Sequence, residues 1–147
     1  MRFDVDTKAS PEQVRRAFTD FTDRRPQIWR RTLDPNTYEV RERGDTWAVA
    51  RESTPGSPFW VVVRYDWSEP AVIRWTVQES SYGGGGEGFV RIAPGDKGGS
   101  RVRAEWFYTG ARSQRLMLFL MEDVPMGSLL SRMYASALDR YAHDDLH

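Results

Sequence analysis

Residues 86–108, GEGFVRIAPGDKGGSRVRAEWFY, contain two runs in which apolar and polar residues alternate. Gly88, Val90 and Ile92 share one face of the first run, and Val102, Ala104, Trp106 and Tyr108 share one face of the second. Alternation with a period of two predicts β-strands that are covered on one face. The proline- and glycine-rich residues 94–99 between the runs predict a turn, so the segment predicts an antiparallel strand pair.

The same alternation occurs in five other segments of the chain, at residues 3–7, 38–42, 47–51, 59–67 and 73–77. Each segment has one apolar face and one mixed, charged face, which is typical of an antiparallel sheet with a single covered side. Gly44 and Asp45 predict a two-residue hairpin that places Val40 opposite Val49. The sequence therefore predicts seven antiparallel strands, in sequential order except for the first.

Three helices are expected around this sheet. Ser10, Pro11 and Gln13 form a helix start with a capping box. A short second helix is predicted at residues 26–31, and a long helical region at residues 113–141 is predicted to cover the sheet. Pro125 cannot donate a hydrogen bond to Met121, so a kink is expected within residues 123–127. The predicted fold is one α+β domain over residues 1–147.

Composition excludes several classes of function. Lys+Arg and Asp+Glu both number 21 in the 147 residues, and this balance argues against a nucleic-acid-binding protein. The absence of Cys excludes disulfides and thiolate metal sites and fits a cytoplasmic location. The N-terminal residues lack the apolar region of a signal peptide. The longest apolar run, residues 116–121, is too short for a membrane span.

Four consecutive glycines, Gly83–Gly86, raise the question of a phosphate-binding loop. Such a loop needs a helix directly after it, usually with a Lys and a Ser or Thr. Here a strand follows, so the run predicts a bent connection between two strands. A second interpretation is that this glycine-rich connection moves as a gate at the rim of a cavity.

With its elements in this order, the sequence resembles the START-like, or SRPBCC, superfamily, and most nearly its polyketide cyclase/dehydrase-type members. The resemblance rests on residues 3–20, FDVDTKASPEQVRRAFTD, on residues 86–108 and on the long final helix. It implies a helix-grip fold, in which a curved sheet wraps around the C-terminal helix and encloses an apolar cavity. Members of this superfamily bind lipids, polyketides and other hydrophobic molecules, and a minority are enzymes.

Aromatic residues make up 13% of the chain, with six Trp, which suggests that some of them line such a cavity. Five aromatic residues share the parity of the apolar strand faces and are predicted to face the C-terminal helical region. Arg51 and Glu79 are predicted polar anchors among them. The predicted ligand-binding residues are Trp47, Arg51, Tyr65, Trp75, Glu79, Trp106, Tyr108, Met117, Leu120 and Met121.

The sequence contains little recognisable catalytic chemistry. His143 and His147 lie at the C-terminus, where a solvated tail is expected, and with no other His a Ser-His-Asp triad is excluded. No metal or cofactor is predicted. Acid–base work would fall to carboxylates, Tyr or Arg on the cavity face, among them Glu42 and Tyr38. Arg51 with Glu42 or Glu79 is a candidate buried pair, and the alternative is that these residues reach solvent at strand ends.

Three functions stay open at this point. The first is binding of a hydrophobic small molecule, such as a lipid, polyketide or aromatic compound. The second is a cyclase- or dehydratase-type enzyme acting on a polyketide-like substrate. The third is a protein-interaction module, with a homodimer formed through outer-face aromatic residues at Trp60, Phe89 and Phe107.

Overall fold

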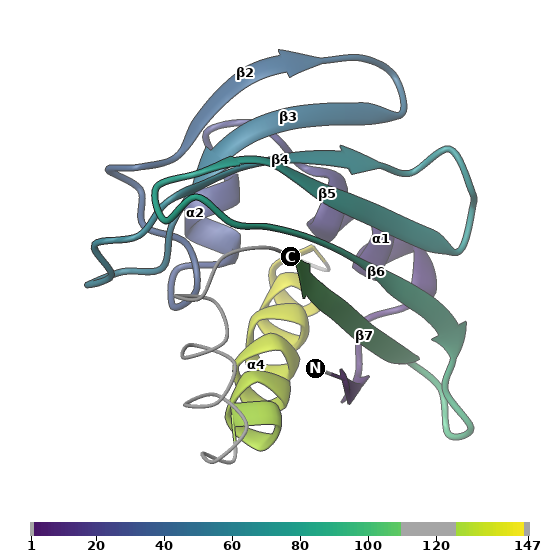
Figure 1. Ribbon diagram of the computed structural model, residues 1–147. Helices are drawn as coiled ribbons and strands as arrows, with labels where there is room; N and C mark the ends of the chain where they lie inside the picture. The colour runs from purple at the N-terminus through teal and green to yellow at the C-terminus, as the bar shows by residue number, and fades with distance from the viewer. Residues whose placement is uncertain (1, 110–125, 146–147) are drawn as a thin grey trace.

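Figure 1 shows the computed structural model, in which a curved sheet arches over the C-terminal helix α4. The structure describes residues 2–109 and 126–145, and the side chains of residues 2–107 and 129–145. The elements in chain order are β1 (Arg2–Thr7), α1 (Pro11–Thr19), α2 (Arg25–Ile28), β2 (Glu39–Arg43), β3 (Trp47–Glu52), β4 (Val61–Asp66), β5 (Val72–Ser80), β6 (Gly85–Pro94), β7 (Ser100–Thr109) and α4 (Met126–Asp145).

The seven strands form one sheet in the order β1-β7-β6-β5-β4-β3-β2, and every neighbouring pair is antiparallel. This confirms the predicted α+β class and the sequential order with β1 as the exception. The last strand, β7, pairs with the first strand, β1, so β1 is the one described strand that does not neighbour its successor in the chain. Residues 86–108 form most of the β6–β7 pair, which lies next to the edge strand β1.

α4 is attached to β1 through side-chain hydrogen bonds. Ser131 donates its hydroxyl proton to the carbonyl of Asp4 at 2.6 Å. Asp139 Oδ1 accepts from the Thr7 hydroxyl at 2.6 Å and from the Lys8 backbone N–H at 2.8 Å. These contacts hold α4 against one side of the sheet, and the face directed toward α4 is called the inner face below.

α1 begins as the sequence predicts. Ser10 Oγ accepts from the Gln13 backbone N–H at 3.2 Å, and the Gln13 side chain accepts from the Ser10 N–H at 2.9 Å, which completes the capping box. Further along α1, Arg15 donates to the carbonyls of Trp67, Glu69 and Pro70 and fixes α1 to the β4–β5 connection.

The predicted β2–β3 hairpin has the wrong register. Val40 lies opposite Ala50, not Val49, and Glu42 lies opposite Val49. The register shifts between Val40 and Glu42, where the ladder has a bulge. The Gly44 N–H donates to the Trp47 carbonyl, so Asp45 and Thr46 form the turn, and the pairing next to it is displaced by two positions from the prediction. The bulge makes Arg41 an extra residue of β2 and reduces the displacement to one position at Val40.

The long C-terminal helical region is described only in its second part, as α4. The kink predicted around Pro125 lies outside the described residues, with only the start of α4 reaching into the predicted range. Leu138 in α4 is completely buried, together with Val5, Val14, Ile73 and Val102 from the sheet and α1. The main core therefore lies between the inner face of the sheet and the helices.

Candidate functional site

A cavity of about 320 Å³ lies between the inner face of the sheet and the helices. This volume is at the lower end of the range of roughly 300 to 1,000 Å³ typical of small-molecule sites. Most of the residues around the cavity are apolar or aromatic, and a minority are polar. Those used below are Phe3, Phe18, Arg25, Trp29, Thr32, Glu52, Thr54, Tyr65, Trp75, Gly86, Glu87, Trp106 and Tyr134.

Aromatic rings from separate elements converge on this cavity. Tyr134 of α4 stacks on Phe3 of β1 with ring centroids 5.5 Å apart, and Trp29 meets Tyr134 edge-on at 5.3 Å. Trp106 contacts both Phe3, at 5.5 Å, and Trp75, at 6.4 Å. These separations fall in the range of favourable ring pairs, so each ring is held in position by its neighbours. The result is an aromatic wall of fixed shape.

The glycines of β6 explain why the rings have room. Gly88 pairs with Trp75 and Trp106 on the neighbouring strands, and a Cβ placed on it would lie 2.5 Å from the Trp75 ring. Gly86 lines the cavity. The run was expected to join two strands, but β6 already begins at Gly85, so only Gly83 and Gly84 lie in the connection. The glycines thus leave part of the inner face free of side chains, and a gating role for the connection stays a prediction.

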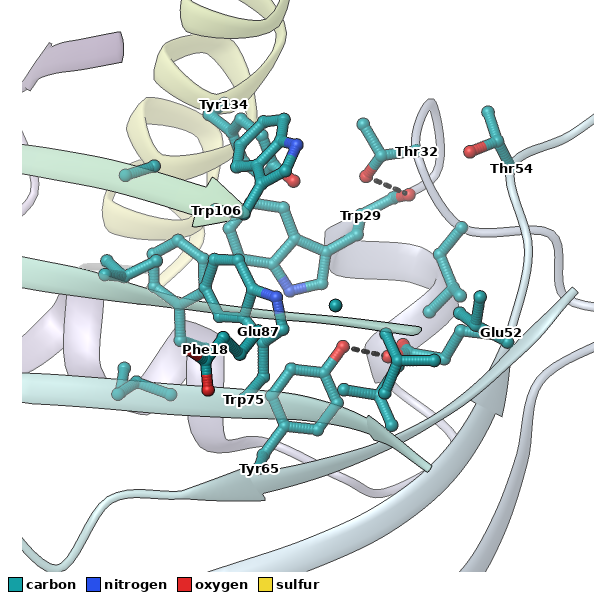
Figure 2. Close-up of a pocket in the computed structure, with 18 of the residues that line it drawn as sticks. Phe18, Trp29, Thr32, Glu52, Thr54, Tyr65, Trp75, Glu87, Trp106 and Tyr134 are labelled. Carbon is teal, nitrogen blue, oxygen red and sulfur yellow. Dashed lines mark hydrogen bonds between the residues drawn. The ribbon is translucent and has the colours of Figure 1, made fainter. Parts of the chain in front are cut away.

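A charged cluster forms part of the cavity wall. Arg25 of α2 donates through Nε to Glu52 Oε2 at 3.0 Å, and both side chains are largely buried, with 6% and 11% of their surface exposed. Arg25 Nη1 also donates to the carbonyl of Phe18 at 3.0 Å. The Tyr65 hydroxyl donates to Glu52 Oε1, as Figure 2 shows. Glu52 therefore accepts from a cation and a phenol at once.

Burial and charge act together on this cluster. Burial opposes the charge of the Arg25 guanidinium, but the Glu52 carboxylate outweighs this effect and raises the pKa of Arg25 above its ordinary value. Burial, and next the charge of Glu52, raise the pKa of the Tyr65 phenol well above its ordinary value. Arg25 is therefore charged and Tyr65 protonated at neutral pH.

The structure brings three of the predicted site residues together. Tyr65, Trp75 and Trp106 line the cavity from β4, β5 and β7, as their parity predicted. Figure 2 shows the rings of Trp75 and Trp106 near that of Tyr134, and Glu52 with Thr32 and Thr54 on the other side of the pocket. The cavity therefore has an aromatic side and a polar side.

The predicted orientation of Trp47 and Arg51 is wrong. The alternate residues of β3, Ala48, Ala50 and Glu52, pair with Tyr65, Val63 and Val61 of the inner face. Trp47 and Arg51 lie on the outer face, where Arg64 covers the Trp47 ring at 5.4 Å and Arg51 covers the Trp60 ring at 4.7 Å. The prediction assigned the face of β3 with the larger side chains to the core. Rings from other elements fill the space beside β3 instead, so β3 directs its small residues, Ala48 and Ala50, toward the inner face.

Glu79 also lies away from the cavity. The β4–β5 pairing shifts between Val62 and Val63, so that Gln78 is an extra residue and Glu79 pairs with the outer-face residue Val62. Its carboxylate lies 3.5 Å from Arg41 Nη1 and is more than half exposed. The candidate pairs of Arg51 with Glu42 or Glu79 are therefore not formed. A bulge of this kind reverses the inward and outward assignment of every residue beyond it.

Four other predicted positions cannot be compared with the structure. Met117, Leu120 and Met121 lie outside the described residues, and the side chain of Tyr108 does as well. Tyr38, a candidate for acid–base work, donates its hydroxyl proton to the carbonyl of Thr22 at 3.1 Å. Burial raises the pKa of Tyr38 to about 12.

Sequence reasoning missed Arg25 and Glu52. Arg25 stood within a basic cluster, Arg24-Arg25 and Arg30-Arg31, that is typical of solvated surface. The signal for Glu52 was its place in the alternation Ala48, Ala50, Glu52, which puts all three residues on one strand face. A face of small residues that ends in a carboxylate leaves space for larger side chains from other elements to pack against it. The signal for Arg25 was its position next to Pro26 at the start of a short helix, and its partner is 27 residues away.

The family described as "polyketide cyclase / dehydrase and lipid transport" matches residues 1–143 of the chain. The chain belongs to this family. The match covers nearly the whole sequence and confirms the resemblance on which the helix-grip fold was predicted. No curated protein matches the sequence significantly.

Solved structures share the fold of this family member at low sequence identity. A protein from Thermus thermophilus is 17% identical with a TM-score of 0.74, covering 99% of this chain and 97% of that one. The Zhui aromatase/cyclase from Streptomyces sp. R1128 is 18% identical with a TM-score of 0.71, covering 100% and 94%. Norcoclaurine synthase from Thalictrum flavum, in complex with dopamine and hydroxybenzaldehyde, is 12% identical with a TM-score of 0.70, covering 98% and 86%.

Metal-binding groups, membrane-spanning helices and the position of His143 were also addressed by the sequence. Among the described residues, no group of three or more His, Cys, Asp or Glu side chains is placed to hold a metal ion. In the same part of the chain, no helix is long and apolar enough to cross a membrane. His143, which was expected in a solvated tail, lies within the last turn of α4.

Proposed function

We propose that this protein binds a hydrophobic, aromatic small molecule in the cavity between the sheet and the helices. The observation that carries the proposal is the aromatic wall, in which the rings of Phe3, Trp29, Trp75, Trp106 and Tyr134 border one space of about 320 Å³. Flat rings held by one another offer a preformed apolar surface, and a preformed surface loses little entropy when a ligand binds. The volume suits a compact ring system better than a long acyl chain.

Extraction tests this proposal directly. Native mass spectrometry of the purified protein, followed by denaturing extraction, should reveal an apolar compound bound at about one molecule per chain. When it is added back, this compound should raise the melting temperature of the wild type more than that of Trp106→Ala. A protein that carries no compound, and gains no thermal stability from small uncharged aromatic molecules, would contradict the proposal.

A second candidate function is a cyclase- or dehydratase-type reaction, and the Arg25–Glu52–Tyr65 cluster favours it. Cyclisation of a ketone substrate requires removal of a proton beside a carbonyl and stabilisation of the resulting oxyanion. Glu52 is a proton acceptor and Arg25 a fixed cation at one wall of the cavity. Membership of a cyclase/dehydrase family supports the same interpretation.

Hydrogen–deuterium exchange tests the second candidate. An aryl β-diketone incubated with the protein in D₂O should exchange its methylene protons faster than in buffer, and NMR measures this rate. Glu52→Gln should remove the acceleration, because an amide cannot take the proton. Exchange at the buffer rate with the wild type would rule out this chemistry for such substrates.

Homodimer formation stays a prediction, and light scattering on the purified protein measures it.

A further inference from the structure

Two buried charges face the cavity, and they cancel each other. Among the described residues that line it, Arg25, Glu52 and Glu87 carry formal charges. Glu87 is exposed to solvent, whereas the side chains of Arg25 and Glu52 are only 6% and 11% exposed, and Arg25 Nε lies 3.0 Å from Glu52 Oε2. The buried part of the wall therefore has no net charge.

A third charge brought into this space would have no partner of its own. Burying an ion costs several kcal/mol unless an opposite charge and hydrogen bonds compensate it. A ligand carboxylate could approach Arg25, but Glu52 already neutralises Arg25 and would repel the newcomer. A ligand ammonium meets the reverse problem, because Arg25 would repel it from Glu52.

The same cluster nevertheless keeps capacity for hydrogen bonds. Arg25 uses Nε for Glu52 and Nη1 for the Phe18 carbonyl, and within the described residues its Nη2 has no hydrogen-bond partner. The Tyr65 hydroxyl donates to Glu52, which leaves the lone pairs of its oxygen able to accept. The wall thus offers a donor and an acceptor without an unbalanced charge.

We propose that the cavity selects aromatic ligands whose polar end is an uncharged oxygen group, a phenol or a ketone, and that this end lies against Arg25 and Tyr65. The inference rests on the proposed function, because it assumes that the cavity binds a ligand. It adds the chemical class of the ligand and the direction in which it lies, with its rings toward Trp75, Trp106 and Tyr134. A cluster that served only to tie α2 to β3 would leave binding to ring area alone.

A matched naphthalene series tests the selection on the wild-type protein. The probes are naphthalene, 2-naphthol, 2-acetylnaphthalene, 2-naphthoate and (2-naphthyl)methylammonium, and their dissociation constants are measured at neutral pH by quenching of Trp fluorescence. We expect 2-naphthol and 2-acetylnaphthalene to bind at least about tenfold more tightly than either ion, which corresponds to about 1.4 kcal/mol. They should also bind more tightly than naphthalene, which has no polar end.

Glu52→Gln changes the predicted selection. This substitution keeps the shape of the side chain but leaves Arg25 uncompensated, so the ratio of 2-naphthoate to 2-naphthol affinity should rise at least about tenfold. Glu79→Gln is the matched control, because Glu79 lies on the outer face in an exposed pair with Arg41 and its loss should leave the ratio unchanged. The ranking in the wild type needs no variant, so it decides the matter even if Glu52→Gln fails to fold.

The outcomes separate this inference from the proposed function. Suppose that 2-naphthol and 2-acetylnaphthalene bind the wild type, but 2-naphthoate or (2-naphthyl)methylammonium binds it as tightly as they do. The cavity then binds ligands without selecting their charge, and this inference is wrong. If Glu52→Gln folds and the ratio does not change, the cluster does not set the selection. If none of the five probes binds, the proposed function fails, and this inference fails with it.

Discussion

At the scale of single residues, the decisive feature is the buried Arg25–Glu52 pair. Its desolvation is offset by direct attraction at 3.0 Å, by the Phe18 carbonyl and by the Phe21 ring 4.1 Å from the guanidinium carbon. A buried pair of this kind adds little to stability compared with well-packed apolar residues, but it leaves an uncompensated charge when one partner is removed. Its presence at a cavity wall therefore suggests a role beyond stability.

Arg25→Met should destabilise the fold by about 3–5 kcal/mol, because Glu52 is left buried without its cation. The double variant Arg25→Met/Glu52→Leu should recover most of that loss, since both charges are then absent. Urea denaturation of Arg25→Met, of Glu52→Leu and of the double variant gives the coupling free energy. If the single variants lose less than about 1 kcal/mol, the pair is solvated and the description of the cluster as buried is wrong.

Tyr65 should make stability depend on alkaline pH. The pKa of Tyr65 is raised in the folded state. Its contribution to the free energy of unfolding is therefore complete below the ordinary pKa of about 10, and it is lost as the pH rises from there toward the pKa of the folded state. In that window the unfolded chain releases a proton that the folded chain keeps, and the free energy of unfolding falls by up to about 1.4 kcal/mol per pH unit.

Urea denaturation at roughly pH 8 to 11 measures this slope. Wild type should lose stability with rising pH more steeply than Tyr65→Phe, which has no phenol to ionise. Tyr38, whose pKa burial raises to about 12, adds a similar slope to both proteins and does not affect the comparison. Equal slopes for the two proteins would contradict the buried position of the Tyr65 hydroxyl.

At the scale of elements, glycine in β6 determines how close the strands and rings approach. A Cβ on Gly88 would lie 2.5 Å from the Glu105 carbonyl oxygen and 2.7 Å from Trp106 Cβ, far inside van der Waals contact. Backbone atoms cannot give way as a flexible side chain can. Gly88 is therefore a packing requirement of the site, although its strand has ordinary extended conformation.

Gly88→Ala should cost about 1–3 kcal/mol and should weaken binding of an uncharged aromatic probe, because Trp75 and Trp106 must move. Gly56→Ala is the control. Gly56 has a φ of 80° and nothing within 4 Å of its added Cβ, so it should cost about 1 kcal/mol from backbone strain and leave probe binding unchanged. Similar probe affinity in Gly88→Ala and Gly56→Ala would show that the ring positions do not depend on Gly88.

The strands, the start of α1 and the order of the elements could be predicted because local signals indicate them. The Ser10–Gln13 capping box, the alternation in β6 and β7 and the turn at residues 94–99 all depend on neighbours in sequence. The faces of β2, β3 and the end of β5 could not be predicted as reliably. Bulges at Arg41 and Gln78 and the choice of the small face of β3 depend on what packs against the strands from distant elements.

At the scale of the whole molecule, the cavity lies where the helices of the described part of the chain leave the inner face uncovered. α4 is fixed to β1 by Ser131 and Asp139, and α1 is fixed to the β4–β5 connection by Arg15. The space between these two attachments is lined by rings and closed on one side by the Arg25–Glu52–Tyr65 cluster. Sequence parity placed Trp75 and Trp106 there, while Arg25 and Glu52 required the tertiary fold.

The most direct test of this account is a titration with the uncharged fluorescent probe N-phenyl-1-naphthylamine. Wild type should bind the probe in a saturable way. Trp75→Ala and Trp106→Ala, confirmed as folded by circular dichroism, should bind it at least about tenfold more weakly, a loss of about 1.4 kcal/mol of ring contact. Trp60→Ala should bind like wild type, because Trp60 lies under Arg51 on the outer face. Failure of the wild type to bind the probe, or equal affinity in the folded Trp75 and Trp106 variants, would contradict the assignment of this cavity as the functional site.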